Sequence, residues 1–170
     1  MICKELQGIK PQIGKNCFLA ENSVLVGDVI LGDNCSVWYN SVVRGDVHHI
    51  RIGDNVNIQD GAVVHCTYKK YSVQIGNNVS IGHNAIVHGC TIHDNVLIGM
   101  GAIVMDNCVI ESGAIIAAGA VVTQGTRVEG AAVYGGIPAR KVKQNDGETI
   151  IGELGEIAKN YITYADWHRQ

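Results

Sequence analysis

The sequence predicts an all-β solenoid with a triangular coil, followed by one C-terminal α-helix. Three observations support this fold class. Apolar residues recur every six positions over most of the chain, and a helical apolar stripe follows residue 143. Glycine accounts for 21 of the 170 residues, whereas aromatic residues make up only 5%. Many glycines and few large side chains favour a thin, regular core with tight corners.

The six-residue period fits neither the 3.6-residue period of a helix nor the alternation of a β-sandwich strand. It fits a coil of about 18 residues with three short sides, which gives about seven coils over the repeat region. Each coil buries its interior only against its neighbours, so several coils must stack. The inward positions of the first series are Ile13, Leu19, Leu25, Leu31, Val37 and Val43, and the later series begin at Ile52, Ile75 and Ile92.

The corners of the coil carry their own signal. Glycine often follows the inward residue, and Asp or Asn often comes next, as in Gly-Asp-Asn at 53–55. These residue types tolerate positive φ. The register is interrupted at residues 49–51, which add three residues, and at residues 67–74, which add five. We expect both insertions to form loops at corners, beside the functional face.

The C-terminal segment predicts a helix of about 20 residues that lies along one face of the prism. Residues 145–148 form an N-cap signal, and the apolar stripe that follows has helical spacing (Ile150, Leu154, Ile157, Tyr161, Ala165). We therefore expect a β-helix over residues 1–142 and a packed helix over 143–170, within a single domain.

Charge and composition exclude some classes of partner. The formal net charge is −3, which favours neither nucleic acid nor an anionic membrane. The sequence has no long apolar run, so we expect no signal peptide and no membrane span. Its six cysteines contain no Cys-x-x-Cys pair. This favours reduced thiols and a cytoplasmic location.

Three of the seven histidines stand out once they are placed on the coil. His65 and His88 follow inward valines and occupy the same slot in consecutive coils, where strands lie ~4.8 Å apart. Two outward imidazoles at that spacing can share a metal ion. His83 lies beyond a corner, so it would join them from an adjacent chain if prisms pack around a threefold axis. For any one of these histidines alone, an ordinary surface role is the simpler interpretation.

Three histidines and one open position form the layout of a catalytic zinc site, although imidazole also suits Fe²⁺ or Co²⁺. Polar residues precede the first histidine, and among them Gln59 is placed to orient a metal-bound hydroxide or a small anion. Arg44 and Asp46 are expected to form an ion pair that joins subunits. The other histidines are assigned structural or solvent-facing roles, with His48 and His49 beside a pocket.

Three motifs resemble the signature of γ-class carbonic anhydrases: Val-Arg-Gly-Asp at 43–46, Asn-Ile-Gln-Asp-Gly at 57–61 before His65, and Ile-Gly-His-Asn-Ala-Ile-Val-His-Gly at 81–89. The resemblance covers residues 10–142. It implies a left-handed β-helix and a homotrimer, in which His65 and His88 of one subunit and His83 of the next bind zinc. It also implies that Gln59 and Asn57 lie beside the metal, that Arg44 pairs with Asp46 across the interface, and that Tyr134 lines the pocket.

The implied reaction is reversible hydration of carbon dioxide to bicarbonate by a zinc-bound hydroxide at the subunit interface. The chain departs from the archetypal enzymes in two places. Val47 stands where they carry a glutamate, and the short basic segment at 67–71 replaces an acidic loop. Proton transfer is therefore expected to be slow unless His48, Tyr68 or a water chain substitutes.

Two other classes of function remain open. Hexapeptide-repeat acyltransferases use the same prism, with a histidine as general base and a coenzyme A groove between subunits. An acyl-coenzyme A thioesterase is a related alternative. The second class is a non-catalytic, metal-binding trimer that retains the ligands for stability.

Overall fold

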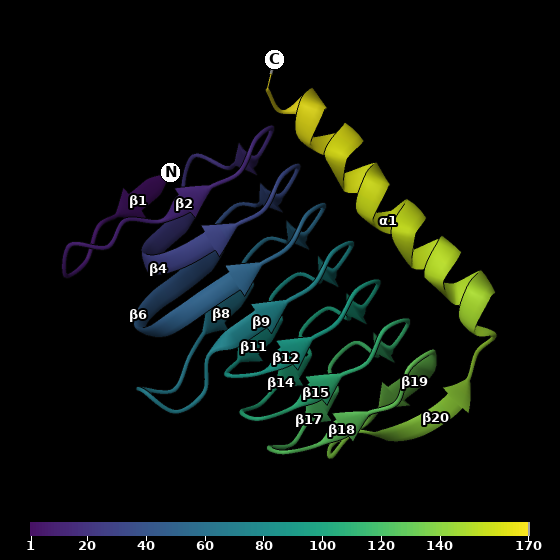
Figure 1. The fold of residues 1–170 in the computed structure, drawn as a ribbon. Coiled ribbons are helices and arrows are strands. Elements are labelled where there is room, and N and C mark those ends of the chain that lie inside the picture. Colours follow the sequence, from purple (N-terminus) through teal and green to yellow (C-terminus); the bar gives the residue numbers. More distant parts are fainter. Residues whose placement is uncertain (170) are drawn as a thin grey trace.

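The computed structural model describes residues 1–169 as a parallel β-solenoid of about seven coils with one C-terminal helix (Figure 1). Short strands stack in register along three faces. The fold class predicted from the six-residue period is therefore confirmed.

We name the three faces A, B and C. Face A contains β1 (Ile2–Lys4), the first halves of β4 (Val24–Leu31) and β6 (Val42–Ile52), β8 (Val63–His65), β11 (Ile86–His88), β14 (Ile103–Val104) and β17 (Val121–Val122). Face B contains β2 (Gln12–Ile13), the second halves of β4 and β6, β9 (Val73–Ile75), β12 (Thr91–Ile92), β15 (Val109–Ile110) and β18 (Arg127–Val128). Faces A and B form one continuous sheet because β4 and β6 turn the corner without a break.

Face C contains β3 (Phe18–Leu19), β5 (Ser36–Val37), β7 (Asn57–Ile58), β10 (Ser80–Ile81), β13 (Leu97–Ile98), β16 (Ile115–Ile116) and β19 (Ala132–Gly135). An unpredicted strand, β20 (Arg140–Gln144), folds back antiparallel to β19 and closes the last coil. The hexad pattern gave no signal for β20 because its five residues are all exposed.

The core is a set of inward columns that run through the coils. On face A, Val43 pairs with Val64, Val64 with Val87, and Val87 with Val104, and all four are fully buried. Because successive side chains of a strand alternate, the residues on either side of each valine point outward. This alternation positions the outward histidines described below.

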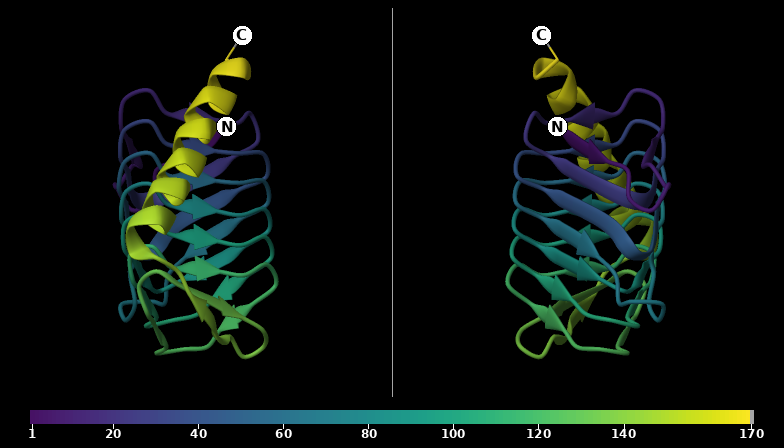
Figure 2. Two further views of the ribbon diagram at one scale, coloured as in Figure 1. Left: turned by 90° about the vertical axis from the view of Figure 1, so that its right-hand side faces the viewer. Right: turned by 90° about the vertical axis from the view of Figure 1, so that its left-hand side faces the viewer.

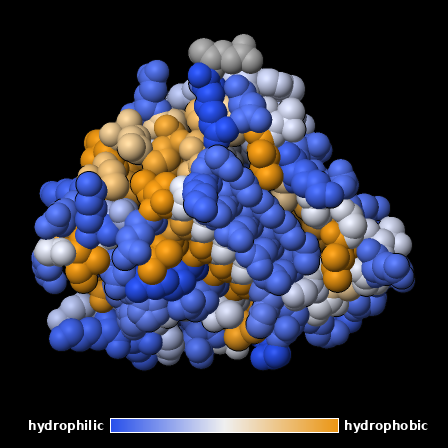
Figure 3. Space-filling model, turned by 45° about the horizontal axis from the view of Figure 1, so that its top comes forward, coloured by the Kyte–Doolittle hydropathy of each residue, from blue (hydrophilic) through white to orange (hydrophobic). Residues whose placement is uncertain are grey.

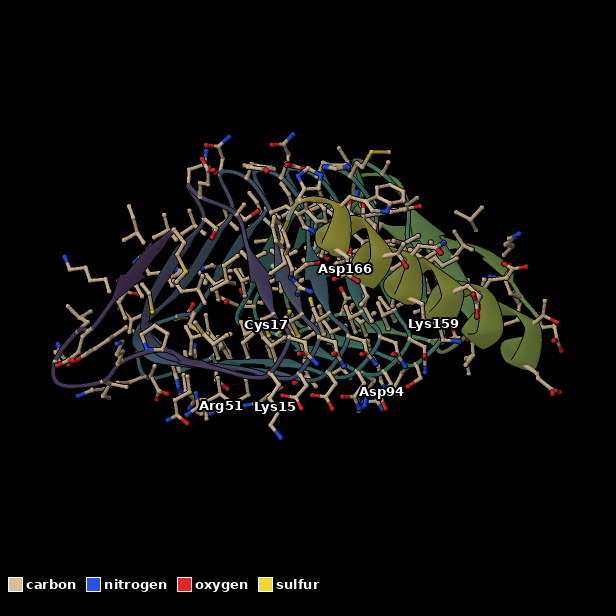
Figure 4. All side chains as sticks on the ribbon, turned by 90° about the horizontal axis from the view of Figure 1, so that it is seen from above. Lys15, Cys17, Arg51, Asp94, Lys159 and Asp166 are labelled. Atoms are coloured by element: carbon tan, nitrogen blue, oxygen red, sulfur yellow. The ribbon has the colours of Figure 1, made fainter. Side chains whose placement is uncertain are left out.

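One corner of the prism is built by asparagines in the left-handed conformation. Asn16, Asn34, Asn55, Asn78 and Asn95 have φ between 54° and 57°. Their side-chain amides form a ladder in which each donates to the next, at 3.0 to 3.3 Å. Viewed end-on, Lys15 and Asp94 lie along one edge of the prism (Figure 4). The ladder satisfies polar groups at a corner that no strand pairing reaches.

The two insertions take different forms, and the first differs from the prediction. Register with β4 shifts between Gly27 and Val29, where residues 46–49 of β6 stand opposite the single Asp28. The three extra residues therefore form a bulge within β6, at 46–49, instead of a loop at 49–51. The second insertion does form a short loop, closed by an antiparallel bridge between Thr67 and Tyr71.

The helix α1 (Gly147–Trp167) begins at the N-cap Asp146, whose side chain accepts a hydrogen bond from the backbone N–H of Thr149 at 2.9 Å. It runs diagonally across face C from the last coil to the first (Figure 2). Its buried residues Ile150, Leu154, Ala158 and Ala165 belong to the predicted stripe or widen it. At its end, His168 packs against Phe18 and Trp38 of the first coils.

The surface has mixed polarity. Hydrophilic side chains cover much of the view in Figure 3, and apolar side chains gather toward one side of it. No helix within residues 1–169 combines the length and apolar character that crossing a bilayer requires. All six cysteines are free thiols.

The asparagine ladder yields a stability prediction. Asn78→Ala removes two ladder bonds and forces a Cβ-bearing residue without a polar side chain to hold positive φ. We expect the free energy of unfolding to fall by about 2 to 3 kcal/mol. Asn78→Gly loses the same bonds but adopts this φ without strain, so its loss should be smaller. Chemical denaturation at one protein concentration measures both, and equal losses would contradict the backbone argument.

Candidate metal centre

The centre is built on two neighbouring strands of face A. His65 ends β8 and His88 ends β11, and the sheet register pairs them directly. Both side chains point outward because each follows an inward valine. The Nδ1 atom of His65 lies 3.1 Å from the Nε2 atom of His88. The structure thus brings this predicted pair together.

Each of these imidazoles is held on its far side by a carboxylate. Nε2 of His65 lies 3.0 Å from Oδ1 of Asp46, and Nδ1 of His88 lies 2.7 Å from Oδ1 of Asp106. Asp46 reaches His65 because it belongs to the bulge of β6, and bulges commonly re-aim side chains in this way. The repeat pattern gives no signal for Asp106, because this residue contacts His88 diagonally from the next coil.

The hydrogen bonds define an unusual inner geometry. If each outer nitrogen carries the hydrogen and donates it to its carboxylate, both inner nitrogens present lone pairs. Two lone pairs 3.1 Å apart repel each other. A shared proton or a metal ion between His65 and His88 relieves that repulsion. The arrangement is therefore suited to bind a cation.

Arg44 and Asp46 form an ion pair within the chain. Their pairing across a subunit interface stays a prediction. Both lie on β6, two residues apart, so their side chains leave the same side of the strand. Arg44 also occupies the slot of His65 one coil earlier. The guanidinium therefore lies beside the carboxylate that orients the first histidine.

The electrostatics of the pair favour a neutral imidazole beside an ionised carboxylate. Burial lowers the pKa of His65, and the Arg44 charge adds to this effect, although the bond to Asp46 opposes it. Burial alone would raise the pKa of Asp46, but hydrogen bonds from Arg44 and His65 outweigh it and lower that pKa. A neutral imidazole is the form that binds a metal.

Two buried thiols lie behind the histidine strands. Burial raises the pKa of Cys66 to about 11 and also raises that of Cys90. Both thiols therefore stay protonated at neutral pH, and a protonated thiol is a poor metal ligand.

His83 lies apart from the pair, in the turn after β10 of face C. Its Nδ1 atom is 2.9 Å from Oδ2 of Asp60, so it also has a carboxylate partner and one free ring nitrogen. Among residues 1–169, no three His, Cys, Asp or Glu side chains are arranged to hold a metal ion. The third predicted ligand is thus separated from the other two within one chain.

Asn57 and Gln59 share the surroundings of His83, not those of His65. Gln59 donates from Nε2 to Oδ1 of Asn57 at 2.9 Å, and Asn57 donates to Oγ of Ser80 at 2.7 Å. Gln59 and His83 line a mostly apolar cleft of about 390 Å³ between face C and α1. Both amide side chains are buried.

Tyr161 of α1 lines the same cleft. The helical stripe predicts packing for this residue and gives no signal for a place in a cleft. Burial, with the nearby Asp60 charge, raises the pKa of its phenol above the ordinary value of 10. Tyr161 therefore presents a neutral hydroxyl beside His83.

Tyr134 does not meet either group. It continues the inward column of face C beneath Ile116, is 7% exposed, and donates its hydroxyl to Oε1 of Glu129 at 3.4 Å. Strands β13 and β16 separate it from the strand that precedes His83. Its ring fills the last coil of this chain, and its place beside a pocket between subunits stays a prediction.

A second, smaller cavity of about 220 Å³ lies beside Asp46 and is lined by His48 and His49. Nδ1 of His48 accepts a hydrogen bond from the backbone N–H of His49 at 2.9 Å, and Nε2 of His49 is 3.0 Å from Nε2 of Gln74. These two histidines therefore border a cavity, as the sequence analysis expected.

The lowered pKa of His65 makes stability depend on pH. An unfolded histidine titrates near 6.5. Below that value the unfolded chain binds more protons than the folded one, so the metal-free protein should lose stability as the pH falls. Denaturation between pH 7.5 and 5 should show a larger loss for wild type than for His65→Gln. An equal loss would contradict the depressed pKa.

Comparison with known proteins places the chain in a family. A model described as bacterial transferase hexapeptide (six repeats) matches residues 10–45, 72–102 and 89–124. Two solved structures are similar over nearly the whole chain, both with a TM-score of 0.91. A hexapeptide transferase family protein from Anaplasma phagocytophilum is 39% identical and covers 97% of this chain and 96% of its own. A Bacillus cereus protein described as an acetyltransferase is 33% identical and covers 98% and 96%.

Three relatives extend the comparison. Protein YrdA of Escherichia coli K12 is 37% identical over 97% of this chain and 92% of its own length. A probable carbonic anhydrase of Methanocaldococcus jannaschii is 46% identical over 89% and 92%. Gamma carbonic anhydrase 2, mitochondrial, of Arabidopsis thaliana is 40% identical over 93% of this chain and 58% of its own length. The chain therefore belongs to the hexapeptide-repeat proteins and, among them, to the γ-class carbonic anhydrase family.

Proposed function

We propose that the protein is a zinc-dependent homotrimer that catalyses the reversible hydration of carbon dioxide to bicarbonate. The observation that carries the proposal is the His65–His88 pair. Its inner nitrogens lie 3.1 Å apart, and its outer nitrogens are held by Asp46 and Asp106. The relatives named as carbonic anhydrases support the choice of reaction.

The pair fits zinc in its donor type and its spacing. Two nitrogens that each lie 2.0–2.1 Å from a tetrahedral zinc are separated by roughly 3.3 Å. The observed 3.1 Å needs only a small outward movement of the rings. Ligand histidines commonly donate a hydrogen bond from their other ring N–H to a carboxylate, and the outer nitrogens of both histidines lie beside a carboxylate here. Fe²⁺ and Co²⁺ suit the same donors.

The third ligand is proposed to be His83 of a neighbouring subunit, because His83 cannot meet the pair within its own chain. The outward side of face A supports such packing. Two residues before the histidine slot, an aliphatic column runs along this face: Val42, Val63, Ile86, Ile103 and Val121. Ile86 is 37% exposed, and contact of its apolar side chain with water is unfavourable in an isolated chain. Covering this column with a second copy would remove it from water and bring another subunit beside the histidines.

A bound zinc ion would supply a Lewis acid that lowers the pKa of water to about 7. The residues of the chain would do the rest. Gln59 donates from Nε2 to Asn57, which fixes its side-chain amide. The Oε1 atom of Gln59 would then accept a hydrogen bond from the hydroxyl of water or bicarbonate. The phenol of Tyr161, which lines the same cleft, would donate a hydrogen bond to the bound substrate, and the apolar walls suit a nonpolar gas.

The released proton needs another route to solvent, because this chain has Val47 and a short basic loop where the archetypal enzymes carry acidic residues. The cavity beside Asp46, lined by His48 and His49, offers one exit. Histidine is the side chain that most readily exchanges protons near neutral pH.

Acyl transfer or acyl-coenzyme A thioester hydrolysis is the second candidate, supported by a different observation. His83 and Asp60 form a histidine–carboxylate pair at the mouth of the apolar cleft, which suits a general base beside an acyl chain. This function predicts that coenzyme A binds the metal-free protein. A non-catalytic trimer would instead hold metal at full occupancy without turnover.

The shared site gives a complementation test. His83→Ala and His88→Ala should each abolish zinc binding, because each removes one of three ligands. Mixed trimers refolded from the two variants regain one intact site wherever the unmodified pair meets the unmodified His83. Zinc content by mass spectrometry measures both results, with His93→Ala as the control that keeps full occupancy. Mixed trimers without zinc would contradict a site shared between subunits.

Turnover is tested by stopped-flow hydration of carbon dioxide across pH on the zinc-loaded protein. Gln59→Ala should lower kcat/KM by about tenfold, the effect of losing one hydrogen bond worth about 1.4 kcal/mol, and should keep zinc. A wild-type rate equal to the uncatalysed background would reject the hydratase and leave the metal-binding trimer.

A further inference from the structure

We propose that Asp106 is a positioning residue for the metal centre: it fixes His88 in the tautomer and orientation that present Nε2 to the metal. This inference rests on the proposed metal site, and neither the motifs nor the relatives point to Asp106. The carboxylate would act through His88, without itself touching metal or substrate.

Both oxygens of Asp106 are engaged. Oδ1 lies 2.7 Å from Nδ1 of His88, which is the shortest of the three histidine–carboxylate contacts described above. Oδ2 accepts a hydrogen bond from Oγ1 of Thr67 at 2.8 Å. Thr67 opens the short loop that follows His65 and Cys66. One carboxylate therefore ties the second ligand strand to the loop leaving the first.

The charge of Asp106 is less shared than that of Asp46. Asp46 forms an ion pair with Arg44, which withdraws part of its negative charge from His65. Within residues 1–169, Asp106 has no Arg or Lys within ion-pair distance, and His88 is its only basic partner. A carboxylate that is not paired with Arg or Lys keeps more of its negative charge for the imidazole. The far ring nitrogen is then a stronger electron-pair donor to a metal ion.

The backbone beside His88 leaves room for this contact. Gly89 has φ +52°, and a Cβ placed there would lie 2.1 Å from Oδ1 of Asp106 and 2.8 Å from Cβ of Tyr71. Any side chain at residue 89 would therefore push the carboxylate away from His88. Two features therefore require glycine at residue 89: the positive φ of the backbone and the close approach of the Asp106 carboxylate.

The test compares Asp106→Ala and Gly89→Ala with wild type. Both variants break the same bond, one by removing the carboxylate and the other by displacing it. Zinc affinity, measured by competition with a chelator, should fall by about 10- to 100-fold in each. Asp94→Ala is the matched control, because Asp94 also accepts a hydrogen bond at a corner, from the backbone N–H of Asn77 at 2.7 Å. Its zinc affinity should not change.

A second readout does not depend on bound metal. Long-range ¹⁵N–¹H NMR of the metal-free protein should show His88 with its hydrogen on Nδ1 in wild type and a mixture of tautomers in Asp106→Ala. Asp106→Asn keeps a carbonyl acceptor for Nδ1–H, so it should restore the tautomer and part of the affinity. That rescue separates positioning from mere structural support.

Unchanged zinc affinity and an unchanged His88 tautomer in Asp106→Ala would overturn the inference. If the wild type itself binds no zinc, the proposed function fails. The tautomer in the metal-free protein would then still decide whether Asp106 sets the orientation of His88.

Discussion

In-register stacking of six-residue sides is the constraint on which the rest of the molecule depends. The inward columns consist of aliphatic residues of similar size, such as Val64, Val87 and Val104, which are all fully buried. Because every coil repeats the path of the last, an outward side chain in one coil lies directly beside the equivalent one in the next. The repeat therefore converts a sequence separation of 23 residues into the 3.1 Å contact of His65 with His88.

The chemistry concentrates where this repeat is broken. The bulge at 46–49 turns Asp46 back toward His65 and opens the cavity beside His48. The loop after His65 brings Thr67 to Asp106. A perfectly regular prism would supply the paired imidazoles and Asp106, which lies in an ordinary corner between β14 and β15, but not the approach of Asp46 to His65. The regular part positions the rings and one carboxylate, and the bulge supplies the other.

Much of the fold could be predicted from the sequence, because period, corner residues and helical stripe are local patterns. Placing His65 and His88 in one slot also required only counting. The remaining features are contacts between coils that counting does not reveal. Asp106 reaches His88 diagonally, and Tyr161 lines the cleft of Gln59 only because α1 folds back over face C. Counting does place Tyr134 in an inward slot, and its ring lies in the core.

The return path of α1 has a consequence for how the chain assembles. Synthesis proceeds from the N-terminus, so the first coils leave the ribosome long before the helix exists. Until then Phe18 and Trp38 lack the cover that His168 and Ala165 provide, and this apolar part of face C stays exposed to water. The segment that follows the last coil therefore covers side chains of the first coils. A solenoid that otherwise grows by contacts between neighbouring coils thus acquires one long-range contact, so its first coils are fully packed only after the helix has been made.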